Sequence, residues 1–254
     1  AKRNGKSAKG KVSYSVLRWM FFVHMEQRGS KRLLKKVNLL MERDPVRLGQ
    51  VIASICRDVA EEANRTLPAH FLAKLICEQF SCEVAGPFMV SLGKQLVKGD
   101  HFRSALIWFK RAIDILDEVP PGSSSPAAGI ALIDAVAHLV LILLHCGSTS
   151  SAAVWLKDAF DKVSRWQAYC QEVPEFTAAH VHLLLAALDF ARHQHQKQSA
   201  LRYSRGLVDL LGDDSIFGVF AVHALSRAAK GIEFAQGPGK ALPIWERAQT
   251  RAEA

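Results

Sequence analysis

The sequence predicts an all-α protein, an α-solenoid of about twelve helices arranged in antiparallel pairs. Apolar residues recur at helical spacing along most of the 254-residue chain, and no stretch alternates apolar and polar residues as a strand would. A short pattern, Ala-x3-large-x2-small, begins at Ala105, Ala152 and Ala241, and a weaker copy begins at Ala200. Recurrence of one pattern along a helical chain indicates helix pairs that stack to bury a shared core.

The first third of the chain predicts helices that lack this pattern. Residues 1–11 are polar and cationic, so we expect a flexible basic arm there, followed by a helical region over 12–83 with a basic face. Within that region we predict helices near 12–27, 30–43, 45–65 and 68–82. Ser30 and Asp44 are suited to cap two of these helices, and Pro45 is suited to a first helical position.

The next helix pair is predicted over Met89–Pro120, with the turn Gly99-Asp100 between its helices. Small residues stand where the two backbones would have to approach closely, and large apolar residues flank them. The small residues are Gly93, Ala105 and Ala112, and the large ones are Leu92, Leu96, Phe102 and Phe109. Pro120-Pro121 then ends the second helix, because proline cannot continue it.

Three further helix pairs follow, each divided by turn residues and separated from the next pair by a break. The turns within the pairs are 147–149, 192–197 and 237–239, and the breaks between pairs are 120–126, 173–174 and 212–215. The apolar run 129–146 lies inside the second of the four pairs. We therefore interpret it as a central helix buried on several sides, not as a membrane span.

The pattern of residues 89–120 resembles the tetratricopeptide repeat, W-x2-L-G-x2-Y followed by A-x3-F, then A, then P. Leu92-Gly93, Ala105, Phe109, Ala112 and Pro120 carry the resemblance, which extends over residues 84–254 as about four helix pairs. It implies a right-handed solenoid. The four alanines are spaced by 47, 48 and 41 residues instead of 34, which predicts longer helices and loops or another kind of helix-pair solenoid.

The resemblance also implies a function, because the first helix of each pair in that family lines a concave surface that binds partners. The implied partner-groove residues are Lys94, Lys98, Leu141, His145, Leu185, Asp189, Arg192, Lys230 and Phe234. The same register places Asp134 and His182 on this surface. The expected function is a non-enzymatic protein–protein interaction scaffold, part of a larger assembly, that binds a peptide or a partner helix along the groove.

Details of the groove refine this expectation. Lys94, Lys98, Arg192 and Lys230 are expected to orient acidic groups of the partner. Some family members hold the C-terminal carboxylates of chaperones with a Lys/Asn/Arg clamp. Here Val90 stands where that clamp has Lys and Lys94 where it has Asn, so chaperone-tail binding is not expected.

The net charge of +9 belongs to one end of the chain. Residues 1–36 sum to +10 and the remaining 218 residues to about −1. The basic patch comprises Lys2, Arg3, Lys6, Lys9, Lys11, Arg28, Lys31, Arg32, Lys35 and Lys36. An alternative function is therefore RNA or DNA binding through this segment, which could also be a nuclear localisation signal or pair with an acidic partner. The expected location is the nucleus or the cytoplasm, with no membrane association.

The sequence contains no catalytic motif that would indicate an enzyme, and we expect no cofactor or metal. The carboxylate pairs Asp114/Asp117 and Asp158/Asp161 are interpreted as solvated helix faces. The pairs His180/His182 and His193/His195 lack the acids or cysteines of a metal site and are interpreted as solvent-exposed. The five cysteines are scattered through apolar segments, which is typical of buried free thiols in a reducing compartment.

Overall fold

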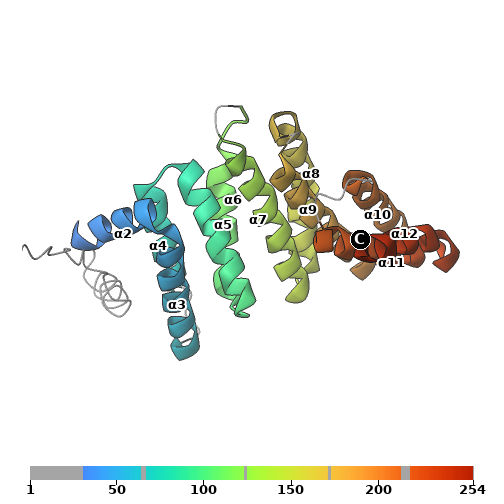
Figure 1. Ribbon diagram of the computed structural model, residues 1–254. Coiled ribbons are helices and arrows are strands. Elements are labelled where there is room, and N and C mark those ends of the chain that lie inside the picture. Colours follow the sequence, from blue (N-terminus) through green and yellow to red (C-terminus); the bar gives the residue numbers. More distant parts are fainter. Residues whose placement is uncertain (1–30, 64–66, 123–124, 171–172, 213–217, 254) are drawn as a thin grey trace, which may run out of the picture.

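The computed structural model of the protein describes residues 31–63, 67–122, 125–170, 173–212 and 218–253. These residues form eleven helices joined by short connections, with no strand among them, which confirms the all-α prediction (Figure 1). The helices are α2 (Lys31–Arg43), α3 (Pro45–Ala63), α4 (Leu67–Gln79), α5 (Cys82–Lys98), α6 (Phe102–Asp117), α7 (Pro126–His145), α8 (Thr149–Cys170), α9 (Pro174–His193), α10 (Lys197–Leu211), α11 (Gly218–Gln236) and α12 (Pro238–Glu253).

Part of the sequence analysis lies outside the described residues. The predicted helix over 12–27, the basic arm over 1–11 and the cap at Ser30 all fall there. The same holds for six members of the basic patch, Lys2, Arg3, Lys6, Lys9, Lys11 and Arg28. The other four lie on α2, where the side chain of Lys35 is exposed.

Caps and prolines begin several helices where the sequence predicts. The Asp44 carboxylate accepts a hydrogen bond from the backbone N–H of Arg47 at 3.0 Å, directly before α3. The Ser125 hydroxyl accepts one from the backbone N–H of Ala127 at 3.2 Å, and Pro126 is the first residue of α7. These local signals fix the helix starts independently of the tertiary packing.

Three turns between consecutive helices share one conformation. Asp100, Gly147 and His195 have φ angles of 60°, 73° and 55°, the left-handed region, after α5, α7 and α9. In each turn the N–H of the next residue donates to the carbonyl five residues back, at 3.0, 2.8 and 2.8 Å. The left-handed residue itself donates to the carbonyl three residues back. These are the two hydrogen bonds of a Schellman motif, so the three helices end in the same way.

In each of the four pairs, a residue with a left-handed backbone stands four or five positions before the pattern alanine. Gly237, with a φ of 91°, begins the connection between α11 and α12 and donates to the carbonyl of Glu233 at 2.8 Å. The left-handed residue precedes the pattern alanine by five residues in three pairs and by four in the last: Asp100 and Ala105, Gly147 and Ala152, His195 and Ala200, Gly237 and Ala241. Each pair therefore repeats one local design.

Small residues bring the helices of each pair together. All four pattern alanines have no exposed surface, and Ala112 and Ala159 are equally buried. At Gly93 in α5, an added Cβ would lie 2.7 Å from the ring of Phe109 in α6, closer than packed atoms approach. The predicted close approach of these two helices, with Phe109 filling the space beside Gly93, is confirmed.

The odd-numbered helices form a continuous row. Each of α3, α5, α7, α9 and α11 contacts the next one in this series, and α5, α7, α9 and α11 also contact the even-numbered helix that follows. The helix α7 is long and apolar enough to cross a membrane, but 78% of its apolar stretch is buried in the protein. Contacts with α5, α6, α8 and α9 account for that apolar character, as expected for a central helix.

The cysteines differ from one another in exposure, although all five are free thiols. Cys56 and Cys170 are buried, and burial raises the pKa of Cys56 to about 12. Cys77 and Cys82 are partly buried. Cys146 is exposed, so the prediction of buried thiols is wrong there, because Cys146 caps α7 and faces solvent beyond the packed part of that helix.

Candidate functional site

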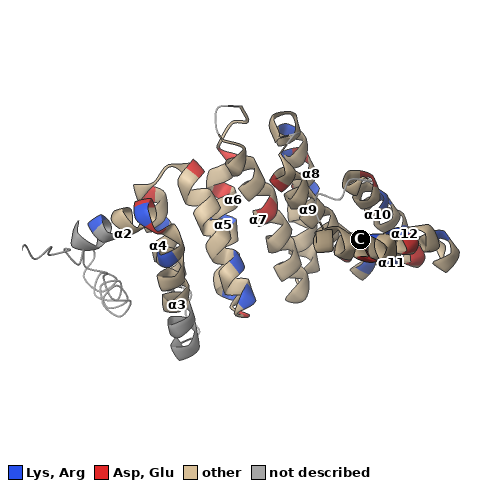
Figure 2. Cartoon of the chain, viewed as in Figure 1, with Lys and Arg blue, Asp and Glu red and all other residues tan. Residues whose placement is uncertain are grey.

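The predicted partner-groove residues lie on four successive odd-numbered helices. Lys98, His145 and Lys230 are exposed, while Lys94, Leu141, Asp189, Arg192 and Phe234 are partly buried. Leu185 is only 9% exposed and belongs to a hydrophobic cluster of α9, α10 and α11, so it contributes packing more than surface. On α5, the basic residues gather in the half of the helix that ends at Lys98 (Figure 2).

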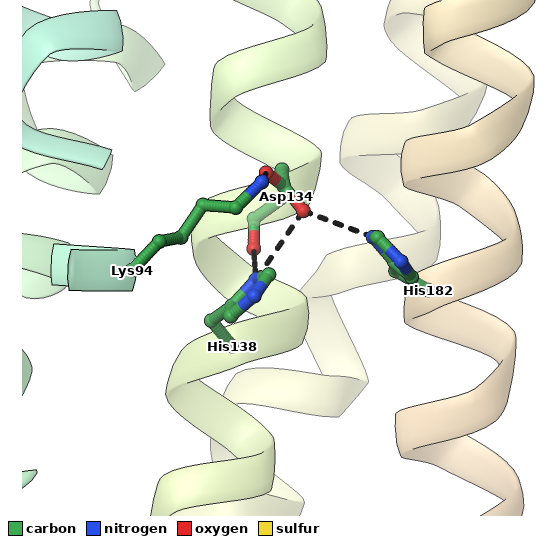
Figure 3. Close-up of polar contacts among 4 residues, drawn as sticks. All are labelled: Lys94, Asp134, His138 and His182. Atoms are coloured by element: carbon green, nitrogen blue, oxygen red, sulfur yellow. Dashed lines mark hydrogen bonds and ion pairs between the residues drawn. The ribbon is translucent and has the colours of Figure 1, made fainter. Parts of the chain in front are cut away.

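A buried carboxylate lies at the centre of this surface. Asp134 is 8% exposed, and the other ionisable residues of α7 are His138 and His145. Its Oδ2 accepts a hydrogen bond from Nζ of Lys94 in α5 at 2.7 Å. Its Oδ1 lies 3.2 Å from Nδ1 of His138, one turn further along α7, and 3.2 Å from Nδ1 of His182 in α9. Figure 3 shows the three side chains converging on Asp134.

The hydrogen bonds fix the protons on both imidazoles. Nδ1 of His138 faces two acceptors, the carboxylate of Asp134 and its backbone carbonyl at 2.9 Å. Nδ1 of His182 faces the same carboxylate. Because these acceptors carry no proton to donate, each Nδ1 must be the protonated nitrogen. The Nε2 atoms are then left as acceptors in the neutral rings, or as donors if the rings are charged.

The environment keeps the carboxylate ionised. Burial raises the pKa of Asp134, but the hydrogen bonds from His138, His182 and Lys94 and the attraction of His138 outweigh burial and hold that pKa well below its usual range. The Lys94 side chain remains 40% exposed, so its ammonium group bridges the buried carboxylate and solvent. The cluster therefore links α5, α7 and α9 through one permanent negative charge.

Aromatic rings surround the two histidines. His138 stacks on Phe109 with ring centroids 5.4 Å apart, and it meets His182 edge-on at 5.8 Å. His182 in turn meets Phe220 of α11 edge-on at 4.9 Å. These contacts hold the imidazole planes in place, so the cluster presents a rigid polar surface across four helices.

The same surface continues toward α11 through a second ion pair. Asp189 of α9 accepts a hydrogen bond from the guanidinium group of Arg227 in α11. Near the ends of the odd-numbered helices, His145 packs against Phe102 with ring centroids 4.6 Å apart, and His195 lies 6.4 Å from Phe234. Charged, aromatic and apolar groups thus alternate along the row.

The chemistry of this cluster favours binding. No group of three or more His, Cys, Asp or Glu residues in the described part of the chain is arranged to hold a metal ion. Among the described residues, nitrogen atoms of Lys94, His138 and His182 surround Asp134, and none of these four side chains is a nucleophilic hydroxyl or thiol. Ordered donors and acceptors of this kind suit recognition of a partner's polar groups.

The interpretation of His180 and His182 as solvent-exposed residues is wrong. Both residues are partly buried: Nδ1 of His182 lies within hydrogen-bonding distance of Asp134, and burial lowers the pKa of the His180 imidazole. His193 and His195 are exposed, as predicted. The register implied by the resemblance placed Lys94, Asp134 and His182 on one surface, but it gave no indication that His138 completes the cluster.

The carboxylate pairs are also more than solvated faces. Asp117 accepts a hydrogen bond from Nζ of the buried Lys162 at 2.6 Å and another from Arg165, and Asp158 forms an ion pair with the same Nζ at 2.9 Å. Burial raises the pKa of Asp117, and its bonds to Lys162 and Arg165 lower it by more, so the net direction is downward. The sequence suggested nothing of this because Lys162 comes from α8 and Asp117 from α6. Asp114, Asp158 and Asp161 are exposed, as predicted, whereas Asp117 is partly buried.

Comparisons with known protein families, with curated proteins and with solved structures found no match.

Proposed function

We propose that this chain is a non-enzymatic protein-interaction module whose helix pairs form a right-handed α-solenoid similar to tetratricopeptide repeats. It binds a segment of a partner protein along the surface formed by α5, α7, α9 and α11. The observation that carries the proposal is the contact of Lys94, Asp134 and His182, three residues that the repeat register assigns to one surface on three successive odd-numbered helices.

The recurring turns support the repeat part of the proposal. A left-handed residue four or five positions before each buried alanine is what equivalent units of a repeat array require, since each unit then joins its two helices in a similar way. The row of contacts through α3, α5, α7, α9 and α11 supports it further, because in a solenoid each unit packs on its neighbours.

The composition of the surface defines the chemistry of the partner. Exposed cations at Lys98 and Lys230 and the partly exposed Arg192 favour carboxylates, whereas Leu141 and Phe234 offer apolar contacts. Asp134 and Asp189 do not repel an acidic segment strongly, because each is already paired with a cation. An extended peptide or a helix that carries acidic and apolar side chains fits this arrangement.

A pull-down from cell lysate with the intact chain tests the proposal, with and without nuclease and at two salt concentrations. We expect a protein partner that survives nuclease and moderate salt. The variants Leu141→Glu and Phe234→Glu should lose it, and so should the double variant Lys98→Glu/Lys230→Glu, whose changed residues are exposed and therefore spare the core. Val154→Glu is the matched control, because Val154 is 71% exposed on α8.

The same experiment separates the alternative function. Recovery of nucleic acid alone, lost at higher salt and lost when the basic residues of segment 1–36 are neutralised, would overturn the proposal in favour of RNA or DNA binding. A protein partner retained equally by all the groove variants would also overturn it. Circular dichroism of each variant confirms that loss of binding is not loss of fold.

A further inference from the structure

A second groove lies between α4 and α6, away from the surface described above. It has a volume of about 780 Å³, and none of the residues lining it belongs to α5, α7, α9 or α11. Its floor is apolar and consists of Ala73 from α4 with Leu106 and Ile107 from α6. Leu106 and Ile107 remain partly exposed although they pack on the core.

The rim of this groove is strongly basic. Lys74, Arg103, Lys110 and Arg111 face a single acid, Asp114, so the lining carries a formal charge of +3 with His70 neutral. Residues 37–254 as a whole sum to about −1, so this is a local concentration of positive charge on a nearly neutral body. Such a field attracts and orients negatively charged partners.

Three cations of the rim, Lys74, Lys110 and Arg111, are exposed and accessible to a ligand. Lys74 pairs with Glu78 at 3.7 Å and Arg111 with Asp114 at 4.0 Å, within single helices and with both partners exposed. Exposed pairs of this type contribute little stability, so carboxylates from a partner can replace them. Lys110 is exposed, and no ion pair joins it to another described residue.

We propose that this groove binds an acidic amphipathic helix of a partner protein. A helix that carries large apolar residues at i, i+3, i+4 and i+7 would place them on Leu106 and Ile107, between the two flanking helices. Its acidic residues would then face Lys74, Lys110 and Arg111. The inference goes beyond the proposed function, because it concerns a different surface and either site can exist without the other.

The lining favours a protein over a nucleic acid. Binding of single strands relies on aromatic side chains that stack on bases, and none of the described residues that line the groove is Phe, Tyr or Trp. Its floor is aliphatic, and burial of aliphatic side chains from a partner on such a floor is favourable. The positive rim and the aliphatic floor are used together only by a ligand that is both acidic and apolar.

Fluorescence anisotropy with a labelled model peptide tests the proposal on the intact chain. The probe is a Leu/Glu peptide of about 18 residues with leucine at i, i+3, i+4 and i+7, and its control is a scrambled peptide of the same composition. We expect Lys110→Glu/Arg111→Glu to weaken binding of the patterned peptide by about tenfold or more. The control Lys157→Glu/Lys240→Glu changes the same net charge at exposed positions of α8 and α12 and should bind as the wild type does.

A charge swap makes the test specific. A Leu/Lys peptide with the same pattern should bind the Lys110→Glu/Arg111→Glu variant better than the wild type. Equal binding of the scrambled peptide, equal weakening by both double variants, or binding of a labelled uridine oligonucleotide with the same dependence on Lys110 and Arg111 would overturn the proposal. A negative result in the peptide assay does not change the result expected from the pull-down with the Lys98 and Lys230 variants. The two proposals can therefore be refuted independently.

Discussion

The Asp134 carboxylate concentrates the polar interactions of α5, α7 and α9 in one residue. Three side chains donate to it, and it is more buried than any of them. A buried charge is costly unless it is paired and hydrogen-bonded, so the cluster is stable only while all three donors are present. Its donors reach solvent, and therefore the same residue that holds three helices together also orders the surface offered to a partner.

Replacement of Asp134 by Asn is expected to destabilise the fold by about 1–2 kcal/mol at neutral pH. The amide oxygen can accept only part of the hydrogen bonds that the carboxylate accepts, and its NH2 group opposes the donors around it. Urea unfolding followed by circular dichroism measures the difference. Asp209→Asn, at an exposed position of α10, is the matched control and should change the free energy of unfolding by less than about 0.5 kcal/mol.

The pH dependence of this difference has a defined sign. The pKa of Asp134 is lowered in the folded protein, so its contribution is complete above the unfolded-state pKa of about 3.9 and is lost as the pH falls below it. The difference in the free energy of unfolding between wild type and Asp134→Asn should therefore become smaller as the pH falls below about 4. If this difference in the free energy of unfolding stays constant down to the pH at which the protein unfolds, the charge of Asp134 does not contribute to stability.

The four helix pairs from α5 to α12 share a similar turn between their two helices. The turn after each odd-numbered helix from α5 to α11 is left-handed, and a buried alanine follows at nearly the same distance in the next helix. In the pair α5/α6 the backbone at Gly93 meets the Phe109 ring with no room for a methyl group. The fit between a small residue and a large one thus sets how closely the pair packs.

Substitution of Gly93 by Ala tests this contact against a matched glycine. Alanine gains about 1 kcal/mol in helix propensity, but overpacking against the fully buried Phe109 costs about 1–3 kcal/mol, so a net loss of stability is expected. Gly239→Ala in α12 meets no atom within 4 Å and should be neutral or stabilising. Denaturant unfolding of both variants measures the change in the free energy of unfolding. A Gly93→Ala variant that is more stable than the wild type would contradict the close approach of α5 and α6 at Gly93.

The sequence predicted the helices better than it predicted their polar contacts. Pro45 and Asp44 mark the start of α3 by local chemistry, and the predicted helix over 30–43 matches α2 to within a residue. The register implied by the tetratricopeptide resemblance also placed Lys94, Asp134 and His182 on one surface. The pairing of Lys162 with Asp117 joins residues that are 45 positions apart, and no local rule states which charged residues of two helices will meet.

At the scale of the whole molecule, the helices follow one another along an elongated body (Figure 1). Contacts run between neighbours in the chain and between successive odd-numbered helices. A body of this kind has no single centre that every element touches. Its local stability is therefore expected to depend on how many neighbours each helix has, as in a linear array with nearest-neighbour coupling.

Hydrogen exchange of the intact chain should reveal this gradient. The helix α7 packs against α5, α6, α8 and α9 and is almost wholly buried, so its amides should exchange most slowly among the described helices. The helix α12 packs chiefly against α11, and its amides should exchange much faster. Mass spectrometry of peptides from each helix measures the order. Asp134→Asn should accelerate exchange in α7 and α9 more than in α12, because the donors that lose their acceptor lie on α5, α7 and α9. Equal protection of α7 and α12 would instead mean that the helices unfold as one cooperative unit, and the linear picture of the molecule would be wrong.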